Sequence, residues 1–158
     1  MKMNHQTSAL LQRFGLNWPL PDEITKEDLP SLVLAEDCVL LKRDFEGNRH
    51  VKVTDFPDKT GFEHFVNHVH FPFTQTKESL LSSLGYAESL RKSLLPLAED
   101  RRLRVVLSIS QDDRSPKFAC TVSFYTIRRG EILITDDLEE YKSEAILVFD
   151  VPELIPGK

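Results

Sequence analysis

Glycine is scarce in this sequence, and none of the six glycines belongs to a phosphate-binding loop. Neither G-x-G-x-x-G nor G-x-x-x-x-G-K-S/T occurs, although such loops are what bring backbone N–H groups close to a phosphate. The order of the predicted elements also lacks repeated βαβ units. The sequence therefore disfavours a nucleotide-dependent enzyme, and we expect no bound cofactor.

Cysteine and long apolar runs are also scarce. Cys38 and Cys120 lie in apolar stretches typical of strands, so we expect two buried thiols in a reducing compartment and no disulfide framework. The longest uninterrupted apolar run covers residues 145–149, far short of the ~20 residues of a membrane-spanning helix. The N-terminus has no run of signal-peptide length. We expect a cytoplasmic protein that does not engage a membrane.

Basic residues are too few for a nucleic-acid-binding protein, because 20 Lys and Arg against 25 Asp and Glu give a net charge of −5. Neutralising phosphates requires clustered Lys and Arg, so we expect no nucleic-acid partner. The acidic excess is concentrated at 135–144, whereas 91–104 is basic. Charge separated in this way can steer a charged protein partner. The alternative is two solvated faces, which is what charge runs usually are.

The chain is long enough for one domain, which would bury about 70% of the surface of its unfolded form. We divide it into an N-terminal helix with a proline-containing arm (1–30), a core (31–151) and a tail (152–158). The helix covers 5–15 and ends at Gly15.

A second helix is predicted at 74–97, where apolar residues recur at intervals of three and four and Pro96 predicts its end. Its apolar stripe consists of Leu80, Leu84, Ala87, Leu90, Leu94 and Leu97. Residues 136–142 are predicted to be a loop or a single helical turn with an Asp at its N-cap. The strands are predicted at 31–45 and 49–56 around a turn at 46–48, at 104–110 and 117–127 as a hairpin, at 131–135, and at 144–151. The fold class is α+β, with a mainly antiparallel sheet covered by one long helix.

Three histidines, His64, His68 and His70, fall within seven positions. The first two share a face only in a helix, and the last two only in a strand, so one backbone conformation cannot present all three. A metal site would need a break in the chain or would use two of them with a ligand from elsewhere. We therefore predict no metal site and retain a metal-dependent hydrolase centred on His64 and His68 as the enzyme alternative.

The cysteine and serine side chains that could act as nucleophiles lack the surroundings that catalysis requires. Cys120 lies on the apolar face of a predicted strand, whereas a reactive thiolate needs an exposed, electropositive site. Ser108 and Ser110 lie in a strand without a G-x-S-x-G elbow. The sequence therefore favours a protein that is not an enzyme.

The acidic stretch is the most partner-like feature, because it combines five carboxylates with an aromatic residue suited to an interface. The alternative is a surface loop in which Asp136 caps a helical turn and Leu138 and Tyr141 point inward. The predicted partner-binding residues are Asp112, Asp113, Asp136, Asp137, Glu139, Glu140, Tyr141 and Glu144.

Residues 104–150, and above all CTVSFYTIRRGEILITDDLEEYKSEAILVFD at 120–150, resemble the small cytosolic immunity proteins of bacterial polymorphic toxin systems. The resemblance implies an inhibitor that occludes a toxin domain, often a basic nuclease, through an acidic surface. These proteins share no active site, so the resemblance supplies no catalytic residue.

A second resemblance is to the small acidic chaperones of type III secretion, which also begin with a helix followed by paired strands. LLQRFGLNWPL and LVLAEDCVLL are similar to their start, whereas those chaperones tend to finish on a helix and this chain finishes on AILVFDV and a proline-containing tail. We therefore expect a non-enzymatic protein whose partner is a cognate toxin or an effector. The sequence also leaves a homodimer possible.

Overall fold

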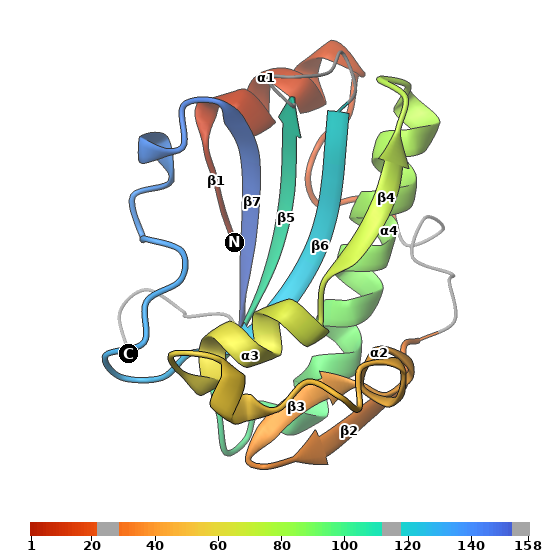
Figure 1. Cartoon of the computed structure of the whole chain (residues 1–158). Helices are drawn as coiled ribbons and strands as arrows, with labels where there is room; N and C mark the ends of the chain where they lie inside the picture. The colour runs from red at the N-terminus through yellow and green to blue at the C-terminus, as the bar shows by residue number, and fades with distance from the viewer. Residues whose placement is uncertain (22–28, 112–117, 153–158) are drawn as a thin grey trace.

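The computed structural model describes residues 1–21, 29–111 and 118–152, and its centre is a five-stranded sheet with the order β1-β7-β5-β6-β4 (Figure 1). Every neighbouring pair in it is antiparallel. The strands are β1 (Lys2–Met3), β4 (Val69–Phe73), β5 (Leu103–Gln111), β6 (Phe118–Thr126) and β7 (Glu144–Val151). The predicted α+β class, in a single domain, is confirmed.

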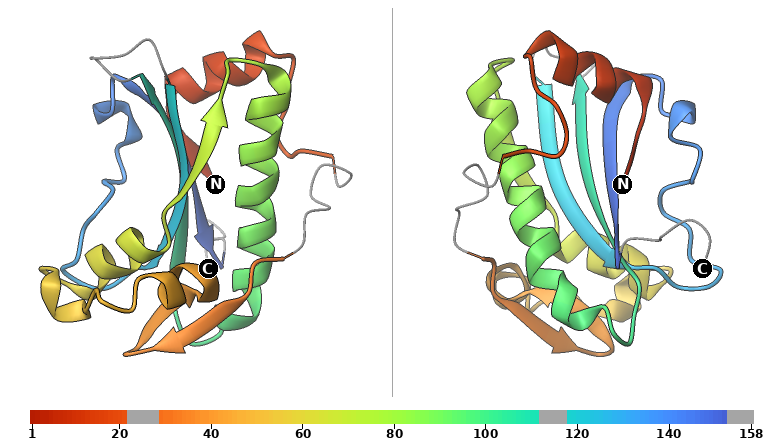
Figure 2. Two further views of the ribbon diagram at one scale, coloured as in Figure 1. Left: turned by 45° about the vertical axis from the view of Figure 1, so that its right-hand side comes forward. Right: turned by 180° about the vertical axis from the view of Figure 1, so that it is seen from behind.

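One face of the sheet packs against α4 (Lys77–Leu94), which runs along it in Figure 2, and against α1 (His5–Arg13) at one end. The predicted stripe is buried from Leu80 to Leu94, because three- and four-residue steps keep these side chains on one side of a helix. They meet alternate residues of the strands, such as Leu107 and Phe124. The helix ends at Leu94, and Pro96 lies in a 3-10 turn, η3 (Leu95–Leu97), as predicted.

The other face of the sheet is covered by the connection between β6 and β7 (Figure 2). Val106, Tyr125 and Ile146 on this face pack with Leu138, which lies in the 3-10 turn η4 (Leu138–Glu140). Asp137 caps η4 by accepting a hydrogen bond from the Glu139 N–H. The predicted strand at 131–135 is wrong, because only an isolated bridge from Arg128 to Glu131 forms there. Leu133 and Ile134 of that stretch instead pack against the sheet face, whereas Ile132 is exposed.

A small hairpin of β2 (Leu32–Ala35) and β3 (Cys38–Leu41) lies at one end of the sheet with α2 (Lys42–Gly47), η2 (Val53–Asp55) and α3 (Lys59–Val66) (Figure 1). The strand predicted at 31–45 is confirmed in part, because it is divided into β2 and β3 and is followed by α2 from Lys42. The turn predicted at 46–48 and the strand predicted at 49–56 are wrong. The hairpin turn is at Glu36 and Asp37, which both have positive φ.

The described helices include none that is both long and apolar enough to cross a lipid bilayer.

Gly15 ends α1 as predicted, and replacing it by alanine should lower the free energy of unfolding by about 1 kcal/mol. Its φ is +62°, and the Gly15 and Leu16 N–H groups donate to the Gln12 and Leu11 carbonyls. A Cβ at Gly15 would have no atom within 4 Å, so the cost is one of backbone conformation alone. Urea denaturation measures it. Gly47→Ala, where φ is not positive and the space is equally open, is the control. An equal loss in both variants would contradict this account.

Candidate functional site

The acidic segment, residues 135–144, lies beside the outer face of the sheet and is anchored from within. Leu138 is buried, and Tyr141 is half-buried against the same apolar cluster. The Tyr141 hydroxyl accepts a hydrogen bond from the Thr135 N–H at 3.1 Å, which joins the first residue of the segment to a residue near its end. Both side chains thus face inward, as the surface-loop alternative predicted, although the cap is Asp137 and not Asp136. Tyr141 therefore fixes the shape of its own segment.

Arg104 fixes the start of the acidic segment. This buried guanidinium donates to Asp136 at 3.0 Å and to both carboxylate oxygens of Asp150 at 2.6 and 3.1 Å. Lys2 reaches Asp136 from the edge strand at 3.2 Å. Hydrogen bonds from Arg104 and Lys2 hold the pKa of Asp136 below its usual value, so this carboxylate stays charged.

Asn4 fixes the end of the segment. This buried side chain donates through Nδ2 to the carbonyls of Glu144 at 2.7 Å and Tyr141 at 3.3 Å. Its Oδ1 accepts from the Thr7 N–H and from Ile146, so the same residue caps α1 and joins it to β7. Glu144 is half-buried and accepts a hydrogen bond from the Ser108 hydroxyl at 2.8 Å.

Asp136 is exposed although it is paired, and three further carboxylates of the segment are also exposed, those of Asp137, Glu139 and Glu140. Glu139 accepts from the His5 N–H at the start of α1 at 2.8 Å, where a helix favours negative charge. Glu140 accepts from the Thr135 hydroxyl at 3.1 Å. The structure thus brings six of the predicted partner-binding residues together in one ordered segment. Asp112 and Asp113 lie outside the described residues.

The three histidine rings lie next to one another because the backbone changes from helix to strand between them. α3 ends at Val66 and β4 begins at Val69. The ring centroids of His64 and His68 are 5.3 Å apart, and those of His68 and His70 are 4.7 Å apart. Within the described ranges, however, no three His, Cys, Asp or Glu side chains are arranged to hold a metal ion.

A buried polar cluster that the sequence did not reveal is built around Glu63 on α3 and Asn67, the residue that caps the end of this helix. Both side chains are fully buried. Glu63 accepts hydrogen bonds from the N–H groups of Val39 at 2.8 Å and Thr126 at 2.6 Å, and it forms an ion pair with Arg128 at 2.8 Å. These contacts join β3 to the end of β6. Their only signal in the sequence is a polar pair spaced i and i+4, one residue before His64 and His68.

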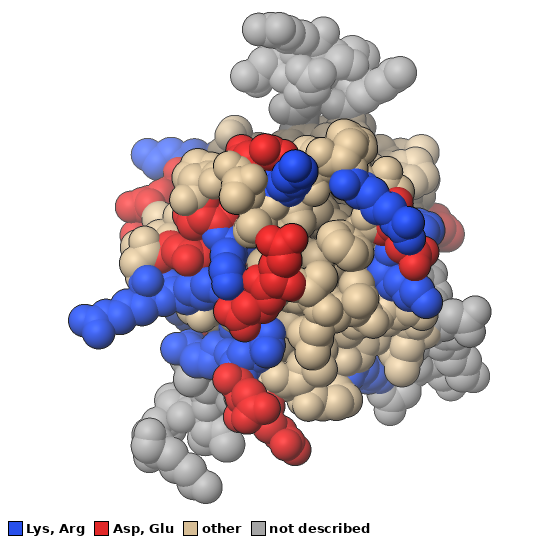
Figure 3. All heavy atoms as spheres, turned by 60° about the horizontal axis from the view of Figure 1, so that its bottom comes forward, with Lys and Arg blue, Asp and Glu red and all other residues tan. Residues whose placement is uncertain are grey.

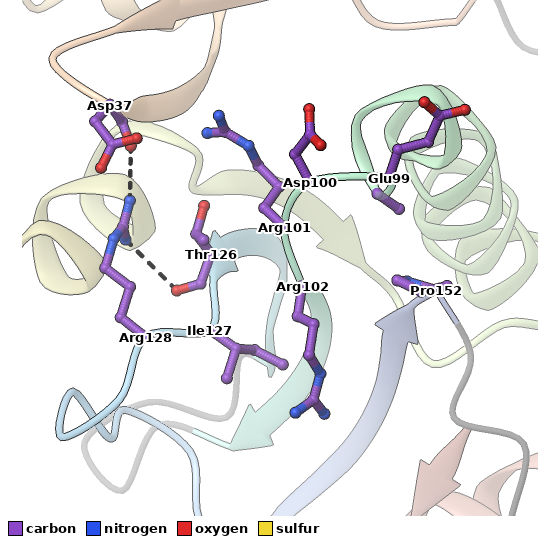
Figure 4. Close-up of a pocket in the computed structure, with 10 residues that line it drawn as sticks. Asp37, Glu99, Asp100, Arg101, Arg102, Thr126, Ile127, Arg128 and Pro152 are labelled. Atoms are coloured by element: carbon purple, nitrogen blue, oxygen red, sulfur yellow. Dashed lines mark hydrogen bonds between the residues drawn. The ribbon is translucent and has the colours of Figure 1, made fainter. Parts of the chain in front are cut away.

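A surface pocket of about 570 Å³ opens next to this group and is lined by Arg101, Arg102, Arg128, Asp37 and Asp100 among others (Figure 4). Arg128 is committed to Glu63 and to the Asp37 carbonyl, and the Arg101 and Arg102 side chains point in opposite directions. The end of the molecule that carries the hairpin shows interleaved basic and acidic side chains (Figure 3). The pocket therefore does not form a convergent anion site.

The two cysteines are free and buried, as predicted. Burial raises the pKa of Cys38 to about 11 and also raises that of Cys120. Both thiols are therefore protonated at neutral pH, which is the opposite of an activated nucleophile.

A family model matches residues 2–156, and its description is the uncharacterized protein PM0498 family. No curated protein and no solved structure matches the chain.

Proposed function

Since the chain belongs to the uncharacterized protein PM0498 family, whose description gives no activity, we propose from its own residues that it is a non-enzymatic protein-binding protein. In its more specific form, the proposal is an immunity protein that neutralises a cognate bacterial toxin by occluding it through the acidic segment. The resemblance of residues 104–150 to immunity proteins supports this specific form.

One observation carries the protein-binding proposal, namely that the acidic segment is ordered while its carboxylates stay exposed. Arg104 and Asn4 hold its two ends, and Tyr141 holds its middle. A surface that already has its bound shape loses little conformational freedom on association. Asp137, Glu139 and Glu140 thus offer negative charge to a basic partner without first having to be ordered.

The proposed mechanism is steric occlusion preceded by electrostatic steering. Exposed carboxylates accelerate the encounter with a basic cleft, and this attraction weakens as salt screens the charges. Because Asp136 is held by Arg104 and Lys2, we expect Glu139 and Glu140 to contribute more to the encounter than Asp136 does.

The double variant Glu139→Lys/Glu140→Lys should slow association with the partner by about tenfold at low salt and reduce the salt dependence of the rate. The partner to use is the protein encoded by the neighbouring gene, and surface plasmon resonance at several salt concentrations measures the rates. Thermal unfolding should show that the variant is folded.

Glu46→Lys/Glu99→Lys makes the same change of charge at two exposed positions outside the segment and is the matched control. If both double variants slow association equally, the effect is one of net charge and the acidic segment is not the interface. A secreted toxin as the neighbouring gene product supports the immunity function. An effector encoded with a secretion apparatus favours the chaperone alternative.

A further inference from the structure

Four aromatic rings form a row from the outer edge of the sheet toward its interior. Their order is His70, His68, His64 and Tyr125, with successive centroid distances of 4.7, 5.3 and 6.3 Å. His70 on β4 is exposed, whereas Tyr125 on β6 is buried. The row therefore joins α3, through His64, to the two strands beside it.

Two nitrogens within the row are buried without a hydrogen-bond partner among the described residues, His64 Nδ1 and His68 Nε2. A neutral imidazole tolerates this arrangement better than a charged one, because a buried charge needs a partner. The ring contacts of His64 and His68 are with each other, with His70 on β4 and with Tyr125 on β6. The charged side chains in this part of the molecule have partners of their own. Glu63 pairs with Arg128, and Glu131 accepts a hydrogen bond from Thr60. Arg104, which interacts with Tyr125, pairs with Asp150.

We infer that His64 and His68, with the His70 ring beside them, form an acid-sensitive latch, which holds α3 against the sheet while the imidazoles of His64 and His68 are neutral and releases it when these two take up protons. The consequence reaches the β2–β3 hairpin, because α3 holds that hairpin through Glu63 and Asn67. The N–H groups of Val39 and Leu41 donate to these two side chains, both at 2.8 Å. An opened α3 therefore exposes both amides.

The direction of the pH dependence follows from the histidines. Burial and the neighbouring His68 lower the pKa of His64 to about 4, and burial and His70 lower the pKa of His68. The opened state binds more protons than the closed one, so the latch contributes its full stability above pH ~6.5 and loses it as the pH falls toward 4. His64 alone should raise the opening equilibrium about 30-fold between pH 7.5 and pH 5.

Hydrogen exchange of the full-length protein at pH 7.5 and pH 5, corrected for intrinsic rates, tests the latch. The protection factors of the Val39 and Leu41 amides should fall about 30-fold, while that of Val106 in β5 should change little. His64→Gln should remove most of this pH dependence. His50→Gln, at an exposed histidine, should leave it intact.

The readout is the change with pH, so it survives a general loss of stability in the variant, and the imidazole pKa of His64 measured by NMR gives an independent check. A His64 pKa near 6.5 would overturn the proposal, as would equal loss of protection in the hairpin and β5. Unchanged pH dependence in His64→Gln/His68→Gln would also overturn it. Stoichiometric zinc in protein purified without a His tag would show that the imidazoles are ligands and not a latch.

Discussion

Replacing Arg128 by methionine should lower the free energy of unfolding by about 3 kcal/mol or more. The Glu63 carboxylate is fully buried, and the Arg128 guanidinium donates to both of its oxygens at 2.8 and 3.1 Å. Without the guanidinium, the carboxylate keeps its hydrogen bonds from neutral groups but loses its only ion-pair partner within the described residues. An unpaired buried charge costs far more than the net contribution of the pair.

Urea denaturation at neutral pH measures this loss. Arg129→Met is the matched control, because Arg129 is the adjacent residue and is exposed. The double variant Glu63→Gln/Arg128→Met should recover a substantial part of the loss, since it removes the buried charge as well. If Arg128→Met and Arg129→Met have the same stability, the ion pair does not hold the hairpin region as described.

The parts of the fold that the sequence predicted well are those in which periodicity alone decides the structure. Leu80, Leu84 and Leu90 on α4 follow a helical period, and Val105 and Leu107 on β5 follow the alternation of a strand. Each of these elements is long and packs against the large core, so local pattern and tertiary packing agree.

The hairpin region could not be predicted in the same way. The turn at Glu36 and Asp37 places two residues in the left-handed region without a glycine, so the sequence gives no turn signal there. Val51 and Val53 alternate like strand residues, but they pack against the hairpin cluster from an irregular segment and a 3-10 turn. Their position is decided by side-chain packing against residues that are distant in the sequence, which a local pattern does not reveal.

The candidate site shows a similar division. The acidic segment was visible as a run of charge, but its anchors, Asn4 and Arg104, are far away in the sequence. His64 and His68 have the same i and i+4 spacing as Glu63 and Asn67, and both pairs extend from α3 into the residues that follow it. Which pair faces the interior depends on where β3 and β6 lie, and only the structure gives that.

Asn67→Leu should lower the free energy of unfolding by about 3 kcal/mol, although leucine has nearly the same size. Asn67 Oδ1 accepts from the Leu41 N–H at 2.8 Å, and Nδ2 donates to the carbonyls of Val39 at 2.8 Å and Phe124 at 3.1 Å. Leucine would leave one buried donor and two buried acceptors without these partners, and each costs about 1 kcal/mol or more.

Urea denaturation measures the total loss, and Asn17→Leu, at an exposed position, should stay within about 0.5 kcal/mol of the parent protein. Hydrogen exchange then locates the loss. The Leu41 amide should lose more protection than the Val106 amide, because Asn67 holds the hairpin and makes no contact with the centre of β5 among its hydrogen bonds. Equal losses at both amides would mean that Asn67 stabilises the domain as a whole. In that case the hairpin and the sheet unfold together, and α3 does not hold the hairpin as a separate unit.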